Sequence, residues 1–145
     1  MNQKYTNIQI MGSSAMKVAV ILAISSQIGI FTPVLAKYKV VIINILGENK
    51  TLNLHCQSKD DDLGVHYVPY AESFEWRFNV NIWRTTLFYC DMGWGDLKGH
   101  FDVFDAKRDM KRCNYEKCIW LVTRDGLDLY IKAAGNYVHQ FDWPK

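Results

Sequence analysis

The sequence lacks the short motifs on which most catalytic and metal-binding proteins depend. It has no G-x-S-x-G nucleophile motif and no glycine-rich phosphate loop. It also has no C-x-x-C pair and no paired histidine spacing, which argues against a zinc site. No repeat, linker or low-complexity segment indicates a second domain. These absences favour a small non-enzymatic domain without a metal or a cofactor.

An excess of charge of one sign is also missing after residue 36. The whole chain has 17 Lys and Arg against 15 Asp and Glu, and two of the basic residues, Lys4 and Lys17, precede residue 37. Residues 37–145 therefore carry 15 basic and 15 acidic side chains. A neutral domain lacks the basic stripe that dominates nucleic-acid binding, so we expect no nucleic-acid partner.

Residues 1–36 have the pattern of a secretory signal peptide. They contain no acidic residue, an apolar run covers residues 18–24, and Val34-Leu35-Ala36 suits a signal peptidase. A membrane-spanning helix needs about 20 apolar residues, and the polar residues at 25–27 interrupt this run. We therefore predict that residues 1–36 are removed and that residues 37–145 form a single extracellular domain. We expect no membrane insertion of the mature chain.

All four cysteines follow the predicted signal peptide, and their even number predicts two disulfides in an oxidising compartment. Four cysteines allow three pairings. Cys56 and Cys118 each share a strand face with large apolar residues, which favours an inter-sheet bridge between them. Cys90, at a strand end, would then pair with Cys113 in a loop.

A glycosylation sequon, Asn49-Lys50-Thr51, lies between two strand-like segments. A glycan is tolerated in such a connecting loop. We therefore predict that Asn49 is glycosylated in the secreted protein.

The dominant side-chain period after residue 36 is two. Phe74, Trp76 and Phe78, for example, alternate with charged or polar residues, and Asp125-Gly126 is a hairpin turn signal. No segment has a convincing amphipathic helical pattern. The strand-like segments cover residues 37–46, 51–57, 65–68, 73–80, 85–91, 100–104, 118–123 and 127–132. The pattern predicts an all-β fold, a small antiparallel β-sandwich of about seven to eight strands.

Three consecutive aspartates, Asp60 to Asp62, are the first candidate for chemistry. They lack the alternating spacing and the downstream Glu of a calcium loop, so a solvated turn is the better interpretation. The flanking His55 and His66 suggest an alternative, a ribonuclease-like acid/base pair. Lys59 is the one cation close in sequence that would hold a phosphate beside such a pair.

Aromatic residues are the second candidate. Trp76 and Trp120 share strand faces with apolar neighbours, so we assign them to the core. Trp83 and Trp94 lie between strand-like segments, where an indole ring can stack on a sugar or on a protein partner.

An ordered series of segments resembles the plant self-incompatibility protein S1 family, the S-protein homologues. The series covers essentially all of residues 37–145, includes the four cysteines, and is specific as a set. Its members are Val41-Ile42-Ile43-Asn44, Leu52 to His66, Phe74-Glu75-Trp76-Arg77-Phe78-Asn79, Thr85 to Cys90, Cys118-Ile119-Trp120 and Asp125-Gly126.

The resemblance implies a small secreted plant protein with a β-sandwich, two disulfides, hydrophilic loops and no enzymatic activity. It also implies a ligand that a plasma-membrane receptor of another cell recognises, with rejection of self pollen as one such process. We expect the contacts in three loops, residues 57–64, 92–99 and 105–117. The candidate contact residues are Lys59, Asp60, Asp61, Asp62, Trp94, Lys98, Lys107 and Arg108. The alternative function is a defence or cell-wall carbohydrate-binding module.

Overall fold

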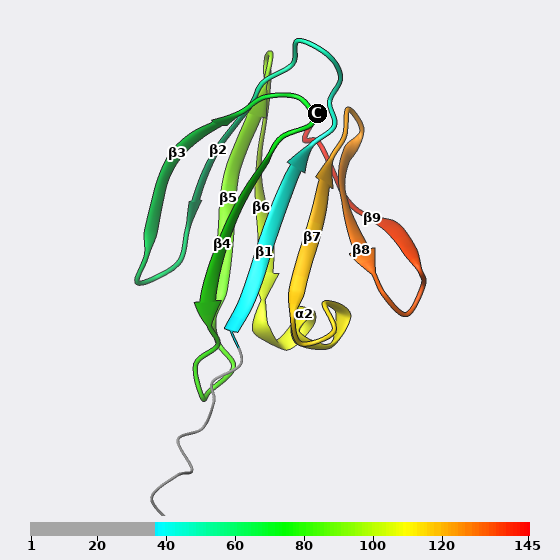
Figure 1. Ribbon diagram of the computed structural model, residues 1–145. Coiled ribbons are helices and arrows are strands. Elements are labelled where there is room, and N and C mark those ends of the chain that lie inside the picture. The colour runs from blue at the N-terminus through cyan, green and yellow to red at the C-terminus, as the bar shows by residue number, and fades with distance from the viewer. Residues whose placement is uncertain (1–36) are drawn as a thin grey trace, which may run out of the picture. The chain divides into compact units, whose positions relative to one another are not determined.

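Two β-sheets packed face to face make up the part of the chain that the computed structural model describes, residues 37–145 (Figure 1). The predicted signal peptide lies outside these residues. One sheet has the order β4 (Ser73–Asn79), β1 (Lys37–Asn44), β7 (Lys117–Val122), β8 (Gly126–Ile131) and β9 (Asn136–Asp142). The other has the order β3 (Asp62–Val68), β2 (Leu52–Gln57), β5 (Leu87–Trp94) and β6 (Leu97–Asp105).

The predicted all-β sandwich is confirmed, with two differences in detail. The described residues contain nine strands, because the aromatic and polar end of the chain forms β9. In addition, β1 pairs antiparallel with β4 but parallel with β7. Sequence periodicity reports which side chains share a face, and it carries no information on strand direction.

The predicted inward faces supply the core. Val40 and Ile42 from β1 and Trp120 from β7 are fully buried, as are Leu52 and Leu54 from β2. The indole Nε1 of Trp120 donates to the carbonyl oxygen of Val103 at 2.9 Å, which satisfies a buried polar group. Each fully buried large apolar side chain contributes about 1.5–3 kcal/mol relative to an exposed one.

The predicted disulfide pairing is wrong, although two disulfides are present. Cys56 and Cys90 lie directly opposite each other on β2 and β5 and are bridged, with a Cα–Cα distance of 4.0 Å. Cys113 is bridged to Cys118, with a Cα–Cα distance of 4.8 Å. Because Cys56 and Cys118 each have another partner, the predicted inter-sheet bridge between them does not form.

A short helix, α2 (Ala106–Arg112), interrupts the strands in a stretch that we predicted to have no helix. Asp105 caps it by accepting from the backbone N–H groups of Lys107 and Arg108. Seven residues make only about two turns, too short to give a periodic sequence signal. Among residues 37–145, no helix has the length and apolarity that crossing a membrane requires.

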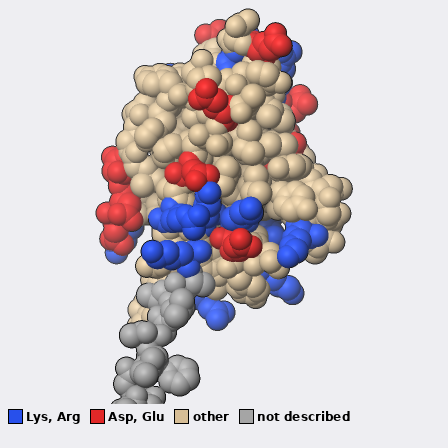
Figure 2. All heavy atoms as spheres, in the orientation of Figure 1, with Lys and Arg blue, Asp and Glu red and all other residues tan. Residues whose placement is uncertain are grey.

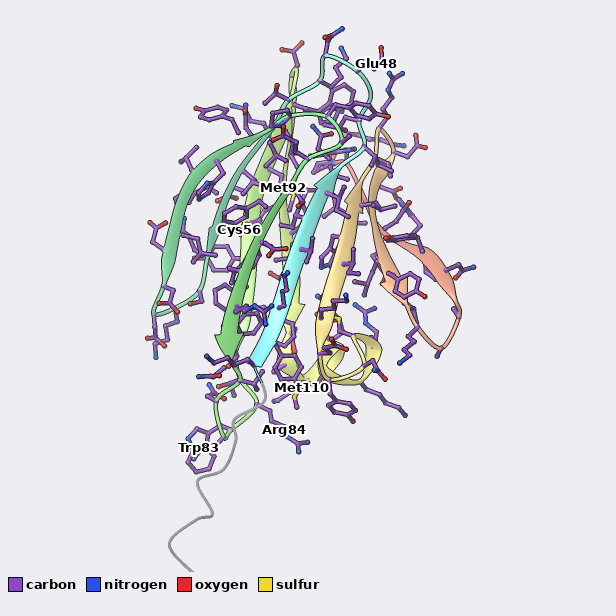
Figure 3. All side chains as sticks on the ribbon, in the orientation of Figure 1. Glu48, Cys56, Trp83, Arg84, Met92 and Met110 are labelled. Atoms are coloured by element: carbon purple, nitrogen blue, oxygen red, sulfur yellow. A yellow bond between two sulfur atoms is a disulfide. The ribbon has the colours of Figure 1, made fainter. Side chains whose placement is uncertain are left out.

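The outer face of the five-stranded sheet is turned toward the viewer in Figures 1 and 2. Basic side chains gather over its lower half, with acidic side chains among them (Figure 2). The opposite end of the sandwich carries the connection between β1 and β2, where Glu48 is labelled (Figure 3).

Candidate functional site

The acidic turn, residues 58–61, has a defined backbone conformation. The backbone N–H of Ser58 donates to the carbonyl oxygen of Asp61 at 2.7 Å. The hydroxyl oxygen of Ser58 accepts from the backbone N–H groups of Asp60 and Asp61, at 3.3 and 3.0 Å. The carboxylates of Asp60 and Asp61 are exposed and have no ion-pair partner within residues 37–145. The turn therefore holds two free negative charges, and Lys59 beside them, in a fixed place.

Asp62 has a different role from its two neighbours. Its Oδ1 accepts from the backbone N–H of Gly64 at 2.9 Å and contacts His55 Nε2 at 2.6 Å. The Gly64 hydrogen bond first, and then the one from His55, hold the pKa of Asp62 below its ordinary value. Gly64 has φ +76°, which favours glycine. Asp62 thus fixes the start of β3, which begins within the loop that we predicted over residues 57–64.

The Trp83 turn, residues 81–86, connects β4 to β5 and displays two large apolar side chains. Ile82 and Trp83 are 77% and 76% exposed. Asn81 holds the turn, because its Oδ1 accepts from Thr85 N–H and its Nδ2 donates to Thr85 Oγ1, both at 2.9 Å. Arg84 follows at φ +54°. Figure 3 shows Trp83 and Arg84 at the lower tip of the sandwich.

A groove of about 730 Å³ separates the acidic turn from the Trp83 turn. Asp60, Asp61 and Trp83 line this inter-turn groove, as do the basic residues Lys59 and Arg77. Phe78 and Phe88, whose ring centroids are 4.6 Å apart, give it an apolar inner surface. The groove therefore combines an apolar interior with a charged rim and one projecting indole ring.

The second predicted loop, residues 92–99, is mostly strand. β5 continues to Trp94 and β6 begins at Leu97, so only a tight turn separates them. Trp94 is half-buried and Lys50 Nζ lies 5.8 Å from its ring centroid, so one face of the ring is already occupied. Lys98 is exposed beside Gly93, in a separate shallow hollow on the four-stranded sheet. The structure does not bring Trp94 or Lys98 to the inter-turn groove.

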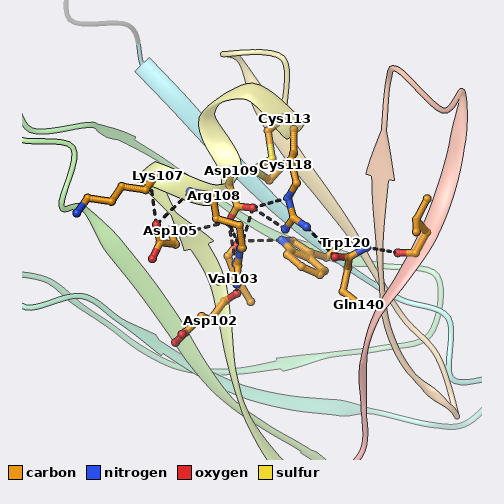
Figure 4. Close-up of polar contacts among 12 residues, drawn as sticks. Asp102, Val103, Asp105, Lys107, Arg108, Asp109, Cys113, Cys118, Trp120 and Gln140 are labelled. Atoms are coloured by element: carbon orange, nitrogen blue, oxygen red, sulfur yellow. Dashed lines mark hydrogen bonds and ion pairs between the residues drawn. A yellow bond between two sulfur atoms is a disulfide. The ribbon is translucent and has the colours of Figure 1, made fainter.

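The third predicted loop contains α2, and its two candidate residues differ. Lys107 is exposed. Arg108 is held by Asp109, with Nη2 to Oδ2 at 2.7 Å, and donates to the carbonyl oxygen of Asp102 (Figure 4). Burial alone would lower the pKa of Arg108, but its hydrogen bonds and ion pair with Asp109 raise it. Arg108 therefore fixes α2 to β6.

The structure separates the two histidines of the ribonuclease-like alternative. His55 shares a row of the four-stranded sheet with exposed Val65, on the outer face. His66 lies beside buried Leu54 and stacks on Phe74 with ring centroids 4.1 Å apart. Its Nε2 lies 2.7 Å from the carbonyl oxygen of Leu63. Alternate residues of a strand point to opposite faces, so these two imidazoles cannot act on one substrate atom.

Two features of the site are not apparent from the sequence. The first is Ile82, which the sequence did not single out although it is more exposed than Trp83. The second is the inter-turn groove, because its two turns are about 20 residues apart in the sequence. The signal for Ile82 was its position beside Trp83 in a segment that breaks the strand alternation.

The predicted glycosylation residue, Asn49, is exposed and has φ +59° in the loop between β1 and β2.

Comparison with known proteins identifies similar chains. The family model described as "Plant self-incompatibility protein S1" matches residues 39–143. S-protein homolog 1 from Arabidopsis thaliana is 34% identical over 117 residues, which cover 79% of this chain and 76% of that protein. S-protein homolog 5 from the same plant is 39% identical over 87 residues, covering 60% of this chain and 66% of that protein.

One solved structure has a similar fold, with a TM-score of 0.60 at 17% sequence identity. The match covers 77% of this chain and 98% of that chain. That protein is described as an SPH (Self-Incompatibility Protein Homologue), from a widespread family of small, highly stable, secreted plant proteins.

Proposed function

Because the chain belongs to the plant self-incompatibility protein S1 family, we propose that it is a secreted, non-enzymatic signalling protein. A receptor protein on the surface of another cell recognises it through the inter-turn groove. Secretion is supported by the signal-like pattern of residues 1–36 and by the description of the solved relative as secreted. The mature protein is then a single domain of residues 37–145.

The observation that carries this proposal is the fixed opposition of free carboxylates and an exposed indole ring. Asp60 and Asp61 are held by backbone hydrogen bonds to Ser58, and Trp83 stands in a turn held by Asn81. A preordered contact surface reduces the entropy lost on binding. Tryptophan anchors commonly supply much of the binding energy at protein interfaces.

The rim of the groove defines the chemistry of the receptor segment that fits it. A Lys or Arg side chain of the receptor would pair with Asp60 and Asp61. An adjacent apolar side chain would pack on Trp83 and on the apolar interior formed by Phe78 and Phe88. The separation of His55 from His66 supports a binding role over acid/base catalysis.

A double variant, Asp60→Asn with Asp61→Asn, tests the role of the acidic turn. We expect unchanged folding, because neither carboxylate has a structural partner within residues 37–145, and at least about tenfold weaker binding. The measurement is binding of labelled protein to plasma-membrane vesicles from floral tissue, with protease-treated vesicles as a blank.

A charge-matched control is the double variant Asp96→Asn with Asp125→Asn. Both residues are exposed and lie outside the groove. If the two double variants bind equally well, the acidic turn has no part in receptor recognition. Trp83→Ala is a third arm, and retention of full binding by this variant would remove the Trp83 turn from the proposal.

The second candidate function is a carbohydrate-binding module. The exposed ring of Trp83 beside the carboxylates of Asp60 and Asp61 favours it, since sugars stack on indole rings and donate hydroxyl hydrogens to carboxylates. A glycan array separates the candidates. Signals that Trp83→Ala abolishes would support the module, and a blank array would exclude it.

Rejection of self pollen is the process that the name of the family associates with such signalling. Confinement of the transcript to the pistil would support that role. Broad expression would instead assign the protein to general signalling between cells.

We also propose that Asn49 carries a glycan. The loop that contains Glu48, its neighbour in sequence, lies at the opposite end of the sandwich from Trp83 (Figure 3). A glycan at that end leaves the inter-turn groove open to a receptor.

A further inference from the structure

Four basic side chains lie in line on the outer face of the five-stranded sheet. In the strand register, Lys39 on β1 lies beside Arg77 on β4 and beside Lys117 on β7. Lys132, one residue beyond the end of β8, lines the same hollow of about 220 Å³ as Lys117. Figure 2 shows basic side chains gathered over the lower half of this face. We call these four residues the basic row.

The basic row points away from the core. Each strand member of the row has a sequence neighbour that faces the interior. These neighbours are Val40 after Lys39, Trp76 before Arg77 and Cys118 after Lys117. Because alternate side chains of a strand point to opposite faces, the basic side chains face outward. No basic stripe is apparent in the sequence, because the four residues come from separate segments and the domain is neutral as a whole.

The fold does not explain the basic row. Like charges opposite each other on neighbouring strands destabilise a sheet. Within residues 37–145, the basic row makes one ion pair, from Lys39 Nζ to Glu75 Oε1 at 2.7 Å. Glu116 also lines the hollow beside Lys117. Two acidic groups do not neutralise four basic ones, so a net positive charge remains along the basic row.

We propose that the basic row binds a linear acidic polysaccharide through the carboxylates on its sugar rings. Neighbouring strands lie about 4.8 Å apart, so four cations across four strands extend over roughly 14 Å. The distance of about 4.8 Å between neighbouring cations is similar to the length of one sugar ring. A polymer with a carboxylate on each ring therefore presents its charges at intervals that the basic row can follow.

The surface beside the basic row fits flat sugar rings. Val41, Ile119 and Tyr130 lie one step further along the same face and are half-buried. Since these side chains do not project, they cannot insert into a bilayer as the apolar residues of membrane-surface proteins do. Sugar rings need only a level apolar surface of this kind.

The test measures binding of the secreted protein to immobilised polygalacturonate at several NaCl concentrations. The protein is produced from the full chain in a eukaryotic secretory host and purified from the medium. The double variant Lys117→Gln with Lys132→Gln removes one end of the basic row and does not alter any residue of the inter-turn groove. The matched control, Lys111→Gln with Lys145→Gln, removes two exposed charges elsewhere.

We expect the Lys117 and Lys132 variant to bind at least about tenfold more weakly than the wild type. Because each cation that contacts a polyanion releases counterions, the slope of log Kd against log salt should fall by about 1.5. The control variant should retain wild-type affinity and slope. Fully methyl-esterified polygalacturonate, which lacks the charges, should not bind.

Several outcomes would overturn the proposal. Equal weakening by both double variants would show that net charge alone governs binding. Absence of wild-type binding to polygalacturonate would exclude the ligand. Tighter binding to phosphatidylserine vesicles or to poly(U) than to polygalacturonate, with the same dependence on Lys117 and Lys132, would reassign the basic row to a membrane or to RNA. Because Lys117 and Lys132 do not line the inter-turn groove, we expect the variant to retain receptor binding in each case.

Discussion

Asp109 is a fully buried carboxylate in a small domain, and it holds two arginines. Its Oδ1 accepts from Arg112 Nη2 at 2.6 Å and its Oδ2 from Arg108 Nη2 at 2.7 Å. The backbone N–H of Asp105 donates to the same Oδ2 at 2.8 Å (Figure 4). Each carboxylate oxygen is therefore satisfied. The two arginines, which Asp109 holds in place, also donate to the carbonyl oxygen of Asp102 on β6 and to Gln140 Oε1 on β9, so they join α2 to both strands.

We predict that Asp109→Ala destabilises the protein by about 3 kcal/mol, because it leaves two partly buried guanidinium groups without their partner. Urea unfolding followed by fluorescence measures the change. Lys107→Ala, an exposed change on the same helix, serves as the control, with an expected change of at most about 0.5 kcal/mol. A loss under about 1 kcal/mol for Asp109→Ala would show that the cluster adds little to stability.

At the residue scale, the sequence predicts which side chains are exposed better than it predicts which groups they contact. The turn position of Trp83 correctly suggested an accessible ring. Arg108 and Asp109, in contrast, lie in the predicted contact loop of residues 105–117, and only tertiary structure shows that Asp109 is buried. For the same reason the three aspartates could not be distinguished, although Asp62 is structural and Asp60 is not.

At the scale of elements, β9 is an edge strand attached to the sheet by its ladder with β8 and by a histidine. His139 Nδ1 lies 2.7 Å from Asp128 Oδ1 on β8, and its Nε2 lies 3.0 Å from Asp142 Oδ1. The hydrogen bonds to Asp128 and then to Asp142 raise the pKa of His139 above 6.5. The charged imidazole thus joins both strands.

We predict that this attachment weakens as the pH rises. A raised pKa in the folded state means that the stabilisation is complete below pH 6.5 and is lost as the pH increases through the folded-state pKa. His139→Gln should therefore lower Tm slightly at pH 5.5 and have no effect at pH 9. Thermal unfolding over this pH range checks the difference. A constant difference in Tm between wild type and variant would contradict the role of the charge.

The strands themselves were predicted where their alternation is regular. β4 and β7 have the expected inward residues, including Trp76 and Trp120. The alternation breaks at β6, where Val103 and Phe104 are adjacent in sequence but both are fully buried. A bulge lies there, because Phe88 pairs with Phe104 while Tyr89 pairs with Asp102. An extra residue in one strand is invisible without knowledge of the partner strand.

At the scale of the whole molecule, the two disulfides constrain very different lengths of chain. Cys56–Cys90 closes a sequence separation of 34 residues, and Cys113–Cys118 closes one of 5. In the chain-entropy model, a bridge stabilises the fold more when it closes a longer loop. The first bridge joins β2 to β5, and the second joins the end of α2 to β7.

We predict that replacing both Cys56 and Cys90 by Ala costs about 4 kcal/mol, and that replacing both Cys113 and Cys118 costs about 2 kcal/mol. Guanidinium unfolding of the two double variants against the wild type measures these values. The reverse order would show that the local structure held by Cys113–Cys118 outweighs the entropy of the longer loop. A peptide map of the unreduced protein provides an independent check of the pairing.

The parallel pairing of β1 with β7 also determines when the five-stranded sheet can form during synthesis. β1 is the first strand of the described residues, yet it can pair with both β4 and β7 only after residue 122 has been synthesised. The ribosome therefore releases almost the whole domain before the centre of this sheet can close. The centre of this sheet therefore closes only once β7 has left the ribosome.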